Sequence, residues 1–138
     1  MVLFESQEDL VREQKAVEAF VSLFSGSYQK LDPYDIDYKI FDKNKQLVAY
    51  AEVKGRLRPM HMAFPLPISV RKMNKLIDKR LRPVVIWACV DGIIYADITK
   101  IQGQIYYGGR EPRAGSSSDL ELMAYYDKQK EFRYLRYS

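Results

Sequence analysis

The chain has 138 residues and a formal net charge of +4, and 47% of its residues are hydrophobic. This length predicts one domain over residues 1–138, and the composition excludes a collagen-like or disordered chain. The single cysteine, Cys89, cannot form an internal disulfide, and no apolar run is long enough to span a membrane. We therefore expect a soluble, cytoplasmic protein, and the basic pI of about 9.1 favours a polyanionic partner.

The first predicted element is a helix over residues 6–24. Its apolar residues fall on one stripe at about 100° per residue. They are Leu10, Ala16, Val17, Phe20, Leu23 and Phe24. Ser6 with Asp9 predicts the N-cap, and Gly26 predicts the end. Glu13 lies in the middle of the stripe, where a carboxylate needs a partner.

Strands are predicted over residues 28–31, 34–41 and 47–54, and the polar segment 42–46 predicts a hairpin between the last two. Residues 55–68 contain three prolines and predict a loop.

Ser69 predicts the N-cap of a second helix over residues 70–80. Its inward-facing residues are expected to be Val70, Met73, Leu76 and Ile77. The apolar run 84–90 predicts a buried strand that contains Cys89 as an inert thiol. The turn Asp91-Gly92 then leads to a hairpin partner over residues 93–98.

The last third of the chain gives weaker patterns. Residues 108–118 predict a flexible loop, and Ser118 with Glu121 predicts the cap of a short helix. Aromatic residues near the end predict a final strand or an extended tail. The whole pattern predicts an α/β fold with a mixed sheet and helices on its faces.

Two carboxylates are expected to meet at the hairpin. If Asp42 pairs with Leu47, then Asp37 lies opposite Glu52, and Asp35 lies opposite Lys54. Like charges facing each other destabilise a sheet unless a cation lies between them, and carboxylate oxygens suit Mg²⁺. Taken singly, each acid could be an ordinary solvated strand end.

His61 is the only histidine in the sequence. Nucleophilic triads are therefore unattractive, and the usual zinc sites, which need several histidine or cysteine ligands, are excluded. We expect His61 to be a surface residue in its methionine-rich loop.

The run Tyr34-Asp35-Ile36-Asp37-Tyr38, a turn, and then Ala49-Tyr50-Ala51-Glu52-Val53-Lys54-Gly55-Arg56 resembles the PD-(D/E)xK nuclease superfamily. The resemblance covers roughly residues 8–99. It implies a restriction-endonuclease-like fold, a mixed sheet flanked by helices in the order helix-strand-strand-strand-helix-strand-strand. The sequence departs from the superfamily motif because no Pro-Asp pair abuts the strand. The choice between Asp35 and Asp37 therefore stays open, and the position opposite Glu52 favours Asp37.

The resemblance also implies roles for individual residues. Asp37, Glu52 and the carbonyl of Val53 would bind Mg²⁺, for which Mn²⁺ would substitute, with Asp35 as the alternative ligand. Lys54 would activate water and stabilise the transition state, and Glu13 would orient water or a second metal. The implied activity is that of a DNA endonuclease, and small members of the superfamily tend to form homodimers.

Basic residues follow the acidic motif closely in the sequence. Those expected to contact the phosphate backbone are Arg56, Arg58, Arg71, Lys72 and Lys75. The resemblance also implies that Lys72 lies near the acids. An ordinary solvated helix face remains an alternative for part of this set.

Two alternatives to an active nuclease stay open. The fold could serve as a catalytically weak module that binds nucleic acid or a protein. It could also be an accessory protein with an incidental Glu-Val-Lys, in which the Asp37 and Glu52 carboxylates would lie far apart.

Overall fold

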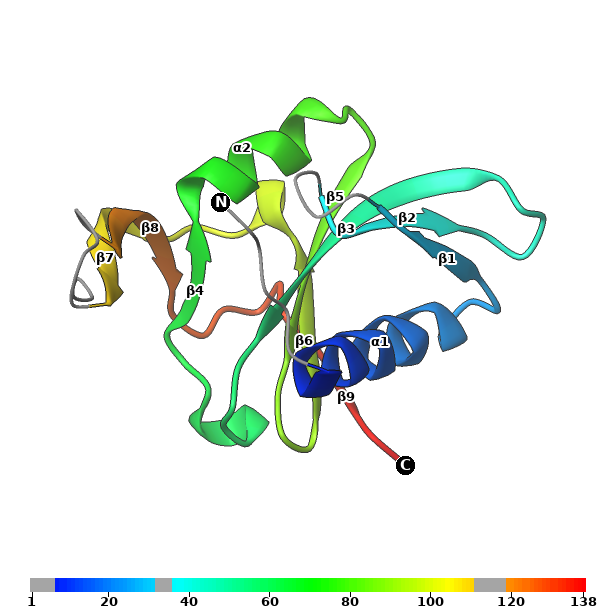
Figure 1. The fold of residues 1–138 in the computed structure, drawn as a ribbon, viewed down its shortest axis with the longest axis horizontal. Helices are drawn as coiled ribbons and strands as arrows, with labels where there is room; N and C mark the ends of the chain where they lie inside the picture. Colours follow the sequence, from blue (N-terminus) through cyan, green and yellow to red (C-terminus); the bar gives the residue numbers. More distant parts are fainter. Residues whose placement is uncertain (1–6, 32–35, 111–118) are drawn as a thin grey trace.

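The computed structural model describes residues 7–31, 36–110 and 119–138, which form a mixed α/β fold (Figure 1). The helices are α1 (Gln7–Ser22) and α2 (Val70–Asp78), and short 3-10 turns cover Met60–Met62 and Ile98–Lys100. The strands are β1 (Ser27–Lys30), β2 (Tyr38–Phe41), β3 (Leu47–Gly55), β4 (Leu66–Ser69), β5 (Arg82–Ala88), β6 (Gly92–Asp97), β7 (Gln104–Arg110), β8 (Asp119–Tyr126) and β9 (Arg133–Arg136). Neither helix of this described part is long and apolar enough to cross a membrane.

The main sheet has six strands in the order β1-β2-β3-β5-β6-β9, and a smaller sheet has the order β4-β8-β7. β3 and β5 are parallel, and every other neighbouring pair is antiparallel. The connection from β3 to β5 carries β4 and α2, as a crossover between parallel strands requires. The mixed sheet with a helix on each face confirms the restriction-endonuclease-like fold (Figure 1).

Two hydrophobic clusters lie on the two faces of the main sheet. On one face, Ala16 and Val17 of α1 pack with Ala51 and Ile86. On the other face, Leu76 of α2 packs with Trp87, whose indole N–H donates to the carbonyl of Pro67 at 2.8 Å. Alternate residues of β3 and β5 therefore face α1 and α2 in turn, which assigns each polar residue of β3 to a face.

The β2–β3 hairpin contains a β-bulge. Phe41 rather than Asp42 pairs with Leu47, so the predicted pairing at the turn is wrong. Ile40 then pairs with Ala49, and the extra residue Val48 shifts the register by one. Because of this shift, the register beyond the bulge agrees with the predicted one.

The predicted helix faces are correct in part. The buried residues of α1 are Ala16, Val17, Phe20 and Val21. Leu10 and Leu23 are exposed; Leu10 lies in the first turn of α1, and Leu23 lies just after its last residue. On α2, Leu76 is buried but Ile77 is exposed, because the short helix covers the sheet with a narrow face. Ser6 lies outside the described residues.

Several other predicted elements are wrong. The strand predicted over 34–41 covers only Tyr38–Phe41 in the described part, and the loop predicted over 55–68 includes the start of β4. The short helix predicted after Ser118 is instead β8, which pairs with both β4 and β7. The predicted loop over 108–118 begins within β7, and residues 111–118 lie outside the described part. The final strand is confirmed as β9.

Ser69 caps α2, as predicted. Its hydroxyl accepts a hydrogen bond from the backbone N–H of Lys72 at 3.2 Å, and its side chain is buried. We expect Ser69→Ala to lower the free energy of unfolding by about 1 kcal/mol, because the helix loses this partner. Urea denaturation measures the change, with exposed Ser27→Ala as the control. Equal stabilities of the two variants would contradict the assigned cap.

Candidate active site

Asp37 lies immediately before β2, next to the centre of β3. Tyr38 pairs with Ala51, and one further step of this register places Asp37 across from Glu52, as predicted. One carboxylate oxygen of Asp37 accepts a hydrogen bond from the backbone N–H of Val53 at 2.8 Å. Asp37 is thus fixed against β3, and the two acids of the motif lie side by side rather than far apart.

Glu52 is the most deeply buried acid of this cluster. Only 6% of its surface is exposed, and its Oε1 has no hydrogen-bond partner among the described residues. Its Oε2 lies 3.8 Å from Nζ of Lys72 on α2. Burial, and then the nearby charge of Asp37, raise the pKa of Glu52 to about 8, while the Lys72 ammonium acts in the opposite direction. Without a cation, an ionised Glu52 is therefore unfavourable here.

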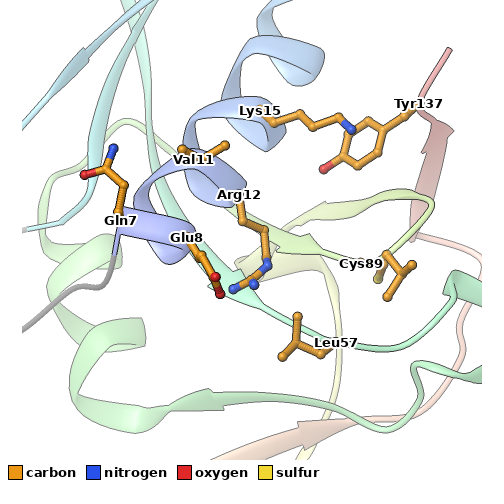
Figure 2. A pocket seen from close by; sticks show the side chains of 9 residues that line it. Gln7, Glu8, Val11, Arg12, Lys15, Leu57, Cys89 and Tyr137 are labelled. Carbon is orange, nitrogen blue, oxygen red and sulfur yellow. The ribbon is translucent and has the colours of Figure 1, made fainter.

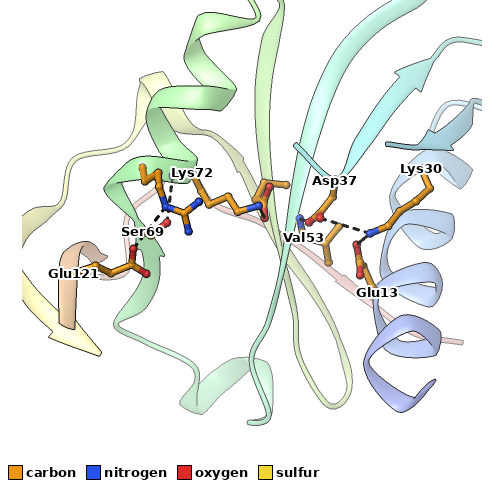
Figure 3. Close-up of polar contacts among 9 residues, drawn as sticks. Glu13, Lys30, Asp37, Val53, Ser69, Lys72 and Glu121 are labelled. Atoms are coloured by element: carbon orange, nitrogen blue, oxygen red, sulfur yellow. Dashed lines mark hydrogen bonds and ion pairs between the residues drawn. The ribbon is translucent and has the colours of Figure 1, made fainter. Parts of the chain in front are cut away.

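Glu13 reaches this region through a lysine. Nζ of Lys30, at the end of β1, lies 2.6 Å from Glu13 and 3.6 Å from Asp37. Figure 3 shows Asp37 between Lys72 on one side and the Lys30–Glu13 pair on the other. Burial, with the charges of Glu13 and Asp37, also raises the pKa of Tyr38 well above its ordinary value.

The acids do not converge on one point. Glu52 shares the face of Val85 and Trp87, on the α2 side of the sheet, because it pairs with Val85 in the parallel register. Glu13 belongs to α1, which covers the opposite face. The described residues contain no group of three or more acidic, histidine or cysteine side chains placed to hold a metal ion.

Asp37 and Glu52 nevertheless fit a hard divalent cation. Two adjacent carboxylates supply oxygen ligands, and the partnerless Oε1 of Glu52 is a buried acceptor that needs a positive partner.

Lys54 lies two residues beyond Glu52 on the same face of β3. Its side chain is exposed, and it pairs in register with Trp87. Lys72, rather than Lys54, lies within ion-pair distance of Glu52. Lys54 is therefore exposed to solvent on the face that carries Glu52, while Lys72 forms the ion pair with the acid.

The predicted basic residues differ in their surroundings. Arg56 is half-buried and donates to the carbonyls of Ala63 and Pro65 at 2.8 and 3.2 Å, so it fixes the loop after β3. Arg58 and Arg71 are exposed, and Arg71 lies 3.9 Å from Glu121. Lys75 is half-buried on α2. Asp35, the alternative metal ligand, lies outside the described residues.

A separate cavity of about 450 Å³ lies between the start of α1, the loop after β3 and the C-terminal segment (Figure 2). Val11, Leu57 and Tyr137 line it, and none of the clustered acids does. Cys89 also borders it but is only 3% exposed, and burial raises the pKa of its thiol to about 11. This agrees with the prediction of an inert buried thiol.

Lys30 was missed by sequence reasoning. A signal was present, because the β1–β2 pairing places Lys30 opposite Tyr38, one residue from Asp37. The short strand β1 gave too weak a pattern to fix that register.

The mixed sheet flanked by helices is consistent with a restriction-endonuclease-like fold, and a match to a family model supports the PD-(D/E)xK nuclease superfamily. Residues 2–135 match the model of the family described as "Phage putative PDDEXK endonuclease". The chain belongs to this endonuclease family. Comparisons with curated proteins and with solved structures gave no match.

Proposed function

We propose that the protein is a Mg²⁺-dependent endodeoxyribonuclease in which Asp37 and Glu52 bind the metal and Mn²⁺ can substitute. One observation supports this most strongly. Glu52 is buried beside Asp37 with one oxygen lacking a partner in the described structure, an arrangement that costs stability unless a cation is bound.

The chain's own residues have separable tasks in this proposal. The Val53 N–H holds Asp37 in place, and the Lys72 ammonium orients Glu52. The backbone carbonyl of Val53 is the third candidate ligand. When bound, the cation polarises the scissile phosphate and lowers the pKa of the attacking water. Lys54, exposed on the same face as Glu52, supplies a positive charge to the phosphate as negative charge develops on it.

Exposed basic residues support a nucleic-acid substrate. Arg58 and Arg71 are exposed, and the net charge is +4, so both can contact phosphates without reading bases. Arg56 contributes by shaping the loop that carries Arg58. We extend the proposal to a homodimer, because cutting both strands of a duplex requires two sites.

Cleavage assays test this proposal. The protein is incubated in Mg²⁺, Mn²⁺ or EDTA with each of four substrates: supercoiled plasmid, linear duplex DNA, a four-way DNA junction and single-stranded RNA. Metal-dependent cutting of a circular DNA substrate is expected. Cutting of RNA alone would replace the DNA assignment, and tight binding of every substrate without cutting would favour the binding-module alternative.

The role of Lys54 gives a separate prediction. Lys54→Met should lower the single-turnover cleavage rate by about 10²-fold, because a charge aimed at the transition state is lost. Its free energy of unfolding should change little, since the side chain is exposed. Exposed Lys128→Met is the matched control. Equal cleavage rates for the two variants would remove Lys54 from the mechanism.

A further inference from the structure

Lys30 is held by two acids at the edge of the site. Its ammonium lies 2.6 Å from Oε1 of Glu13 and 3.6 Å from Oδ1 of Asp37, whose side chains are only 11% and 14% exposed. It also lies 5.0 Å from the centre of the Tyr38 ring, within range of a cation–π contact. Three groups from α1, β2 and the segment before β2 therefore fix one positive charge.

The two oxygens of Asp37 face different surroundings. Oδ2 accepts from the Val53 N–H on β3, and Oδ1 is the oxygen nearest Lys30. On the α1 side, the single ammonium of Lys30 already offsets part of the negative charge of Asp37 and Glu13. On the α2 side, Oε1 of Glu52 has no described partner, and the Lys72 ammonium lies 3.8 Å from the other oxygen, Oε2. The closest ion pair of the described cluster is therefore on the α1 side, between Lys30 and Glu13, whereas the oxygen without a described partner is on the α2 side.

Solvent reaches Lys30 on the α1 side. A cavity of about 350 Å³ opens beside Lys30 and is lined by Gln7, Leu10, Gln14, Tyr28 and Tyr38 as well. Lys30 itself is 34% exposed. A cation that enters this cavity meets the ammonium of Lys30 before either carboxylate, and the charge of Lys30 opposes its binding there.

We propose that Lys30 serves as a permanent cation between Glu13 and Asp37, so that the site takes up one divalent metal ion instead of two. In two-metal nucleases, carboxylates hold a second cation beside the first. The Lys30 ammonium, 2.6 Å from Glu13 and 3.6 Å from Asp37, lies between the two carboxylates that would have to hold such a second ion. Lys30 is then a positioning residue that also keeps Glu13 from acting as a metal ligand. This inference rests on the proposed function.

Metal stoichiometry, measured by titration calorimetry of the full metal-free chain with Mn²⁺, tests the inference without any activity measurement. The natural protein should bind one Mn²⁺ per chain. Lys30→Met should bind a second, weaker Mn²⁺, because Glu13 and Asp37 lose their ammonium. Adding Glu13→Gln to that variant should return the count to one. Lys39→Met, on the neighbouring strand β2, is the matched control and should bind one.

A second variant covers the case in which Lys30→Met does not fold, which circular dichroism would reveal. Glu13→Gln alone should still bind one Mn²⁺, with an affinity within about twofold of the natural value. Two ions on the natural protein, or one ion on folded Lys30→Met, would overturn the role of Lys30 while leaving metal-dependent cleavage intact. No ion on a natural protein that also fails to cleave would overturn the proposed function itself.

Discussion

Glu52→Gln should lower the rate of metal-dependent plasmid cleavage by about 10³-fold, the largest change in activity that we expect. The glutamine has nearly the same shape, but it removes the charge with which Glu52 would bind the metal. Asp37 is left as the single carboxylate beside Val53, which is too few ligands for tight Mg²⁺ binding.

The experiment compares single-turnover rates at saturating Mg²⁺. Glu8→Gln is the matched control, because Glu8 is exposed on α1 and its substitution removes the same charge. Its rate should equal that of the natural protein. A Glu52→Gln variant that cleaves at the natural rate would exclude Glu52 as a ligand required for catalysis.

The same substitution should stabilise the metal-free protein. The folded-state pKa of Glu52 is raised from 4.5 to about 8, chiefly by burial and then by the charge of Asp37. Because the folded-state pKa is raised, protonated Glu52 contributes its full share to the free energy of unfolding below about pH 4.5. That contribution is lost as the pH rises through 8. We expect this loss to be on the order of 3 kcal/mol between pH 5 and 8, allowing for relaxation around a coupled pair.

Urea denaturation in EDTA at pH 5 and pH 8 measures this loss. Glu52→Gln should lack most of it and should be the more stable protein at pH 8, whereas Glu8→Gln should behave like the natural protein. Addition of Mg²⁺ at pH 8 should stabilise the natural protein and leave Glu52→Gln nearly unchanged, because the ion binds the charged carboxylate. Parallel pH profiles for the natural protein and Glu52→Gln would contradict the environment assigned to Glu52.

The sequence was informative where local patterns determine the structure. Two local patterns were enough to predict the pairing of Asp37 with Glu52. The apolar centre of β3 ends in Glu52 and Lys54, and the preceding predicted strand carries an acid. That prediction survived an error at the turn, because the bulge at Val48 restored the register. The cap at Ser69 was predicted correctly for the same reason, since it depends on four consecutive residues.

Features set by distant contacts were predicted poorly. Lys30 belongs to a four-residue strand, β1, and the pairing of β1 with β2 determines where the Lys30 side chain points. No local sequence pattern predicts that pairing. β8 was mistaken for a helix because a capping pattern at Ser118 and Glu121 masked the alternation of Leu120, Leu122 and Ala124. Arg56 was assigned to the substrate because its two backbone acceptors in the following loop are visible only in three dimensions.

The most direct test of the account is the position of the metal ion, measured by anomalous scattering from crystals grown with Mn²⁺. We expect one strong peak between the carboxylates of Asp37 and Glu52, on the α2 side of Asp37, and none between Glu13 and Asp37. A peak elsewhere on the protein, or full Mn²⁺ binding that leaves Glu52 without a contact, would contradict the claim that these two acids form the metal centre.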